Sequence, residues 1–250
     1  MFRLLMLLTF AAFIVFTNNS LSSDYDHEYS DLSGYLSKNV NNGMVDYKKI
    51  KANPEGIINL LDLASKVTKD DFNTWDNKQK LTFLINLYNT QTIKLIIDNY
   101  PLKSIKDIGN PWDLKVVELF GEKVSLNYLE NDVIRKNFHE PRIHFALVCA
   151  AKGCPELISE SYKTSILDKQ LESGVKTFFT KSTINRLDLA ASTIYLSHIF
   201  EWYGNDFKNK SGSVKKYVLP YLTKKELSEG EIESLKISYT DYDWSLNEKI

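Results

Sequence analysis

The side chains best suited to chemistry lie in one stretch of this sequence, RIHFALVCAAKGCPEL at residues 142–157. The stretch contains both cysteines of the chain, Cys149 and Cys154, and one of its four histidines, His144. A thiol with a histidine in hydrogen-bond reach, itself held by a third group, is the general arrangement of an activated nucleophile. The stretch therefore suggests a Cys/His thiol site.

Cys154 is the better nucleophile candidate of the two cysteines. Gly153 can make a turn, and Pro155 suits the first position of a helix, which would place Cys154 at the N-cap. Backbone N–H groups and the helix dipole would stabilise a thiolate there. Cys149 is five residues from His144, so the two side chains face opposite ways in an unbroken strand. We therefore predict Cys149 to be a core residue and only a reserve nucleophile.

Several polar residues could hold the histidine or bind a substrate. Glu130, Asn86 or Asn89 could orient His144. The two asparagines share one side of a predicted helix, where they could equally bind a ligand or satisfy buried backbone groups. Asp243 and Trp244, near the end of the chain, could line a substrate groove or hold the C-terminus in place.

Two functions remain open at this point. The first is a thiol-dependent hydrolase or acyltransferase of the cell envelope, acting on an amide or a thioester. The second is a non-catalytic envelope binding domain in which Cys149 and Cys154 form a disulfide, which would close a very small loop. In either case the expected ligand is a small molecule or peptide of unknown identity. No metal or other cofactor is expected, because the sequence lacks standard zinc spacing, Walker motifs and dinucleotide glycine motifs.

Composition and the N-terminus limit the partners and the location. The chain has 250 residues, with 31 basic and 32 acidic side chains and a net charge of −1. It therefore lacks the positive field that gathers nucleic acid. Arg3 and the apolar run Leu4–Phe16 resemble a signal peptide, and the run is shorter than the ~20 residues that span a bilayer. We predict a signal peptide over 1–22, a loose lead-in over 23–44, a single domain over 45–250, no stable membrane span in the mature chain, and export to the periplasm or the medium.

Hydrophobic periodicity indicates an α+β domain, with helices packed on a small mixed or antiparallel sheet. The apolar residues 142–150 predict a buried central strand. Hairpins are expected around Gly121 and around residues 191–192, and a last strand within 235–244. Helices are expected over 56–67, from a capping box at Asp76 and Gln79 to Pro101, over 125–138 with a capping pair at Asn127 and Glu130, over 165–179, over 198–207, and from Thr223 onward.

Several stretches together resemble the domain of unknown function 547 family. LTFLINLYNTQTI, VSLNYLENDVIR and PRIHFALVCAAKGCPEL resemble three of its motifs, and LSHIFEWYGNDF and YTDYDWSLN resemble its closing motifs. The resemblance extends over about residues 45–247. The resemblance implies that the chain is an exported bacterial member of the family. It implies no particular activity, because no activity is established for the family.

Overall fold

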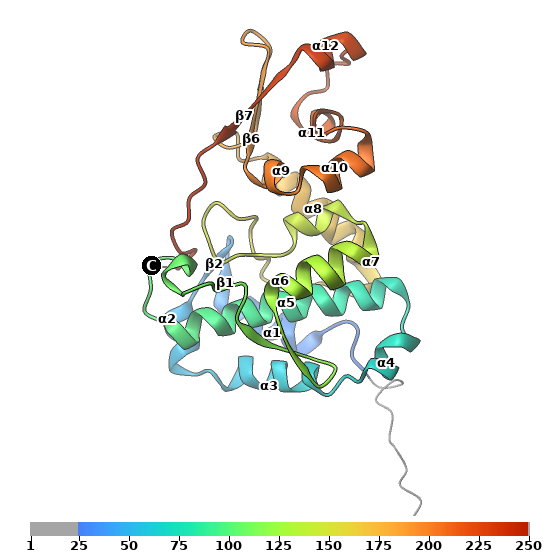
Figure 1. Cartoon of the computed structure of the whole chain (residues 1–250). Coiled ribbons are helices and arrows are strands. Elements are labelled where there is room, and N and C mark those ends of the chain that lie inside the picture. Colours follow the sequence, from blue (N-terminus) through green and yellow to red (C-terminus); the bar gives the residue numbers. More distant parts are fainter. Residues whose placement is uncertain (1–24, 250) are drawn as a thin grey trace, which may run out of the picture.

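The structure is a computed structural model that describes residues 25–249 (Figure 1). The predicted signal peptide, residues 1–22, lies outside these described residues. An α+β fold is confirmed, because many helices surround three small sheets. In the described part of the chain, no helix is long and apolar enough to cross a membrane.

The helix α5 (Asn77–Asn99) is the centre of the N-terminal half (Figure 1). It begins where the sequence predicts, because Asp76 and Gln79 form both hydrogen bonds of a capping box. Nearly every residue from Leu81 to Ile97 is buried, so the helix is surrounded by other elements rather than amphipathic. The elements before it in sequence are α1 (Ser30–Asn39), β1 (Val40–Asn41), β2 (Met44–Val45), α2 (Tyr47–Ala52), α3 (Glu55–Ser65) and α4 (Lys69–Thr74).

The helix α1 corrects the prediction of a loose lead-in over residues 23–44. Its residues Leu32 and Leu36 are buried in the same apolar cluster as α5. Only one side of this short helix contacts the core, so most of its residues are polar or small. The folded domain therefore includes residues before 45.

The middle of the chain contains the predicted hairpin and an uninterrupted helical segment after it. Strands β3 (Lys115–Leu119) and β4 (Glu122–Ser125) pair in antiparallel fashion around Gly121. The Asn127–Glu130 capping pair is wrong, because the side chain of Ser125 accepts the N-terminal hydrogen bond instead, from the N–H of Tyr128. The helical segment comprises α6 (Leu126–Tyr128), the π-helix η3 (Leu129–Arg135) and α7 (Lys136–Phe138). The short 3-10 helix η2 (Ile105–Asp107) precedes the hairpin.

The central strand predicted over residues 142–150 is wrong. Residues Pro141–Phe145 form a 3-10 helix, η4, and the following residues run as an irregular segment with Ala150 at a φ of 57°. A run that is apolar on all sides is compatible with any buried conformation, so its hydrophobicity does not specify a strand. Pro141 favours the first turn of a helix instead.

The buried central strand is β6 (Thr193–Ser197), in the mixed three-stranded sheet of the C-terminal half. It pairs antiparallel with β5 (Arg186–Asp188) in the predicted hairpin and parallel with β7 (Lys236–Thr240), the predicted last strand. Helix α12 (Glu229–Ser234) is capped by Ser228, so the predicted start at Thr223 is wrong. The other elements of this half are η5 (Thr164–Ile166), α8 (Leu167–Phe179), α9 (Ile199–Trp202), α10 (Gly204–Ser211) and α11 (Val214–Leu222).

Two apolar clusters form the core. The first surrounds α5 and extends from Tyr29 to Leu171, with Leu246 added from the C-terminal segment. The second lies among α8, β6, α9, α10 and α11. Phe145, at the end of η4, packs in the second cluster, while its neighbours Ile143 and Ala146 pack in the first. The segment with the candidate chemistry therefore joins the two clusters.

Candidate functional site

A cavity of about 300 Å³ lies around the predicted cysteine site, and we call it the disulfide cavity. Segments far apart in the sequence meet there, from α5, η2, η3, η4, α9 and the C-terminal segment. The cavity contains five of the eight residues predicted for the site, namely Glu130, His144, Cys149, Cys154 and Trp244. Its other lining residues are Tyr88, Lys106, Trp112, Asn127, Leu147, Pro155, Ile199, Trp202, Tyr203 and Tyr242.

The two cysteines are joined to each other in a disulfide. Because they are the only cysteines of the chain, this bond leaves no free thiol. The N–H of Cys149 donates to Sγ of Cys154 at 3.0 Å, and the hydroxyl of Tyr242 lies 3.2 Å from Cys154 Sγ and 3.3 Å from Cys149 Sγ. Both sulfurs therefore lie in the cavity wall with polar groups against them.

The surroundings of Cys154 differ from the prediction. The residues after Pro155 are not helical, so Cys154 is not an N-cap and no helix dipole acts on its sulfur. Cys154 is 4% exposed, whereas Cys149 is partly exposed. A nucleophile approaching from the cavity would therefore meet Cys149 more readily than Cys154.

His144 lines the same cavity as the cysteines, although strand parity predicts that it faces away from Cys149. That prediction fails because residues 142–150 are not a strand. The His144 ring stacks on Tyr203 with ring centroids 3.8 Å apart, and its Nε2 lies 2.8 Å from Oδ2 of Asp206. A carboxylate only accepts hydrogen bonds, so Nε2–H of His144 donates to Asp206.

Asp206, on α10, is the third group that the sequence assigned to Glu130, Asn86 or Asn89. Arg135 also donates to it, from Nε at 2.8 Å and from Nη2 at 3.0 Å. Burial by itself raises the pKa of Asp206, but the hydrogen bonds from His144 and Arg135 outweigh burial and hold the pKa well below its ordinary value. Asp206 lies in LSHIFEWYGNDF, one of the stretches behind the family resemblance, which is the signal that could have identified it.

Glu130 is a buried carboxylate in the cavity wall. It is 6% exposed and accepts a hydrogen bond from the Tyr88 hydroxyl at 3.2 Å. Burial, and then the negative charge of Glu130, raise the pKa of both Tyr88 and Tyr203 well above the ordinary value, so both phenols stay protonated at neutral pH. Arg135 and Arg142 form their ion pairs with Asp206 and Glu140 rather than with Glu130.

The two asparagines of α5 form hydrogen bonds with backbone groups and do not line the disulfide cavity. Asn86 donates to the carbonyl of Tyr162 and accepts from its N–H, at 2.9 and 3.0 Å. Asn89 donates to the carbonyl of Ala146 at 2.9 Å and accepts from the N–H of Val148 at 3.0 Å. Asn89 thus fixes the backbone that leads from His144 to Cys149.

The C-terminal segment closes one side of the cavity. Trp244 packs against Tyr242 with ring centroids 4.6 Å apart, and Nζ of Lys106 lies 3.7 Å from the centroid of the Trp244 ring. Asp243 faces outward and accepts from the N–H of Ser245, while its backbone carbonyl accepts from the N–H of Gly153 at 2.8 Å. Trp244 therefore lines the cavity, whereas Asp243 lies outside it and contacts the turn at Gly153 through its backbone.

No arrangement typical of a metal centre occurs among residues 25–249, where no three His, Cys, Asp or Glu side chains converge. The two cavity sulfurs are committed to each other, and Asp206 is committed to His144 and Arg135. What the cavity can do chemically therefore depends on its aromatic surfaces, the Glu130 carboxylate, the histidine and the disulfide.

The chain matches a protein-family model. No curated protein and no solved structure matches the chain. The matching family model is described as "Protein of unknown function, DUF547" and covers residues 72–179. These residues include α5, Glu130, His144 and both cysteines, but not Asp206 or the C-terminal segment. Over residues 72–179 the chain is thus similar to the family of unknown function DUF547, as its motifs indicate.

Proposed function

We propose that the domain binds a small molecule or the end of a peptide in the disulfide cavity. The observation that carries this proposal is the lining of the cavity, which contains three of the four tryptophans of the chain and a buried carboxylate, Glu130. Cavities of about this size, lined by aromatic rings and a few convergent polar groups, are typical of ligand sites. The tryptophans are Trp112, Trp202 and Trp244.

The wall favours a ligand with a flat apolar group and a positively charged nitrogen. A carboxylate has about four acceptor positions. Glu130 accepts one well-aligned hydrogen bond, from Tyr88, and the Tyr203 hydroxyl also lies within its reach, so acceptor positions are left over. An ammonium group would fill further positions with charge-assisted bonds. The position of Lys106 over Trp244 indicates that the wall accommodates a cation against an aromatic face. The amino end of a peptide with an aromatic first residue combines both features.

Phenylalaninamide is a suitable probe, and the intrinsic fluorescence of the tryptophans reports its binding. Hydrogen bonds to charged groups contribute about 1.5–3 kcal/mol, so Glu130→Gln is expected to weaken binding by roughly 10- to 100-fold. Trp244→Ala is expected to weaken binding by about 2- to 10-fold through lost stacking. The acetylated probe, which has no ammonium group, should bind poorly to the unchanged protein.

The exposed residue Glu122 offers a matched control, because Glu122→Gln removes the same charge away from the cavity. That variant should bind the probe as the unchanged protein does. Equal affinity of the probe for the Glu130→Gln variant and the unchanged protein would contradict the proposal.

A thiol-dependent hydrolase or acyltransferase is the second candidate. It is favoured by the His144–Asp206 hydrogen bond, because His144 lines the same cavity as the sulfurs. The closed disulfide holds both sulfurs, so this activity requires a dithiol reductant, which opens the bond by thiol–disulfide exchange and is itself oxidised to a disulfide. A thiolate would then attack the carbonyl carbon of an amide or thioester, form an acyl–sulfur bond and release the amine or thiol with a proton from His144. Water or an acceptor alcohol or amine would take the acyl group and restore the thiolate.

Thiol counting and ester cleavage distinguish the two candidates. Before reduction, a maleimide probe should label no cysteine; after reduction and removal of the reductant, it should label both. Cleavage of p-nitrophenyl acetate by the reduced protein, lost in Cys154→Ser or Cys149→Ser, would support the enzyme. Equal cleavage by the reduced protein and both variants would rule out a thiol mechanism and leave the binding function.

We also propose that the chain works outside the cytoplasm, in the periplasm or the medium. The apolar N-terminal run and the disulfide support this location, because disulfides persist in oxidising compartments. Mass spectrometry of protein recovered from the cell envelope or medium should give a mature chain that begins near Ser22 or Ser23. An intact Met1 on that material would contradict cleavage.

A further inference from the structure

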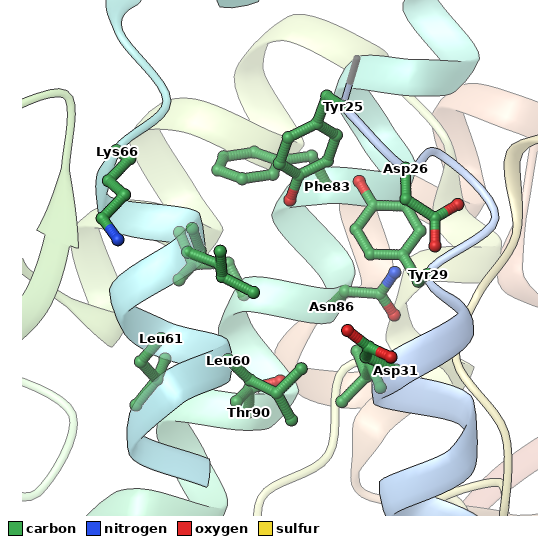
Figure 2. A pocket seen from close by; sticks show the side chains of 14 residues that line it. Tyr25, Asp26, Tyr29, Asp31, Leu60, Leu61, Lys66, Phe83, Asn86 and Thr90 are labelled. Carbon is green, nitrogen blue, oxygen red and sulfur yellow. The ribbon is translucent and has the colours of Figure 1, made fainter. Parts of the chain in front are cut away.

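A second cavity lies between the described start of the chain, α3 and α5 (Figure 2). It has a volume of about 260 Å³ and shares no lining residue with the disulfide cavity. We call it the N-terminal cavity. Its lining residues are Tyr25, Asp26, Tyr29, Asp31, Leu32, Leu60, Leu61, Leu63, Ala64, Lys66, Phe83, Asn86, Leu87 and Thr90.

The walls of the N-terminal cavity are mostly apolar, and its charges lie at the edge. Leu60 and Leu61 of α3 face it from one side, and Phe83 lies on the α5 side (Figure 2). Lys66 and Asp31 are both exposed and lie on opposite sides of the cavity. A body without charge therefore suits the interior, because an ion would lose its hydration there without gaining a partner.

One buried polar group in this wall makes no well-aligned hydrogen bond. Tyr29 is 8% exposed, and its hydroxyl is buried without a well-aligned hydrogen bond to any of residues 25–249. Figure 2 shows its ring reaching in beside Asn86, with the hydroxyl on the side of Tyr25 and Phe83. The Asn86 amide uses its oxygen and one of its two N–H groups on the backbone of Tyr162, and it makes no hydrogen bond to the Tyr29 hydroxyl. Most buried polar groups are paired, so an unpaired hydroxyl in a cavity wall indicates a place for an external partner.

The Tyr29 hydroxyl is a donor at neutral pH. Burial raises the pKa of Tyr29 and of Tyr25 above the ordinary value, so neither phenol ionises. The Tyr25 hydroxyl lies within hydrogen-bond reach of the Tyr29 hydroxyl and helps to raise the pKa of Tyr29, but the two groups are not aligned as a good hydrogen bond. An oxygen atom brought by a ligand would accept from Tyr29.

We propose that the N-terminal cavity binds a neutral amphiphile, with an apolar body in the leucine-lined wall and one oxygen that accepts a hydrogen bond from Tyr29. A water-sized group occupies roughly 30 Å³, so about nine non-hydrogen atoms fill the space. A straight-chain alcohol of about eight carbons has this size and this chemistry. The site is independent of the disulfide cavity and of the function proposed for it.

Titration of the full chain with 1-octanol and with ethylbenzene, followed by NMR, tests this proposal. Both compounds are of similar size, but ethylbenzene has no oxygen. Both should give saturable shifts confined to residues around the N-terminal cavity. Tyr29→Phe should weaken octanol binding about fivefold, as expected for one neutral hydrogen bond, and should leave ethylbenzene binding unchanged.

A second pair of variants, both on α3, tests the location. Ala64→Phe fills the cavity and should abolish the binding of both compounds, with Ala64→Leu as a smaller replacement if the first variant does not fold. Ile58 is 45% exposed and does not line the cavity, so Ile58→Phe should leave binding intact. The proposal is overturned if octanol does not saturate, if its shifts map to the disulfide cavity, or if Tyr29→Phe weakens both compounds equally.

Discussion

The roles of Asn86 and Asn89 follow only in part from their positions in the sequence. The spacing of Asn86 and Asn89 correctly places both on one side of a helix, and their burial makes hydrogen bonding obligatory. Whether these amides hydrogen-bond a ligand or the backbone depends on partners 57 to 76 residues away in sequence. Local spacing does not specify such partners. In the structure, each of the two side chains makes two hydrogen bonds to the backbone of an irregular segment.

Asn89→Ala is therefore expected to destabilise the protein. It leaves the carbonyl of Ala146 and the N–H of Val148 buried without partners, and each such group costs about 1–3 kcal/mol. We expect the free energy of unfolding, measured in urea, to fall by about 2–4 kcal/mol. Asn77→Ala, at an exposed position of the same helix, should change it by less than about 0.5 kcal/mol. An Asn89→Ala variant of unchanged stability that loses ligand binding would instead favour the ligand-binding role.

The depressed pKa of Asp206 predicts a pH dependence of stability. A carboxyl whose pKa is lower in the folded state stabilises the fold above its unfolded pKa of about 4, and this contribution is lost as pH falls through the folded pKa. Asp206→Asn should lower the free energy of unfolding at pH 7 and flatten its decline below about pH 4. Urea unfolding from pH 3 to pH 7 measures both effects. Asp132→Asn, an exposed change near Arg135, is the control and should show the same fall in the free energy of unfolding at low pH as the unchanged protein. If this fall persists in Asp206→Asn, other groups are responsible for it.

At the scale of elements, prediction succeeded where local signals agree and failed where tertiary contacts decide. The start of α5 and the two hairpins depend on a capping box and on turn residues, and all three were predicted. In residues 142–150 the only local signal is an apolar run. Such a run is compatible with a strand and equally with the observed 3-10 helix and loop. Their conformation is set by Asn89, by the disulfide and by the C-terminal segment, all of which are distant in sequence or absent until the chain folds.

The contact between the cysteine turn and the C-terminal segment requires a glycine at position 153. A Cβ added there would lie 2.9 Å from the backbone nitrogen of Asp243 and 3.0 Å from the ring of Tyr242. Gly153→Ala should therefore move the C-terminal segment, lower the free energy of unfolding by about 1–3 kcal/mol and alter the fluorescence of Trp244. Gly230→Ala meets no atom within 4 Å and lies in α12, so it should be neutral or slightly stabilising. If the two variants have equal free energies of unfolding and equal tryptophan fluorescence, the contact at Gly153 is not closely packed.

At the scale of the whole molecule, the disulfide cavity lies where the two apolar clusters meet. η4 enters the first cluster through Ile143 and the second through Phe145, and His144 between them reaches across to Asp206 of α10. Residues 72–179, which match the family model, supply most of one side of the cavity, and the C-terminal half supplies Trp202, Tyr203 and Trp244. The site is thus complete only when both halves of the chain are folded together.

Phe145→Ala tests how far the two clusters depend on each other. Phe145 is 1% exposed and packs on Phe178, Phe200 and Phe207, so its removal should cost about 3–5 kcal/mol. Hydrogen exchange should then show lost protection in β6 and α11, while amides of α5 stay protected. Ile85→Ala, in the first cluster, is the matched change and should reduce protection in α5 first. If each variant instead lowers protection equally everywhere, the clusters unfold as one cooperative unit, and the disulfide cavity cannot open through one half alone.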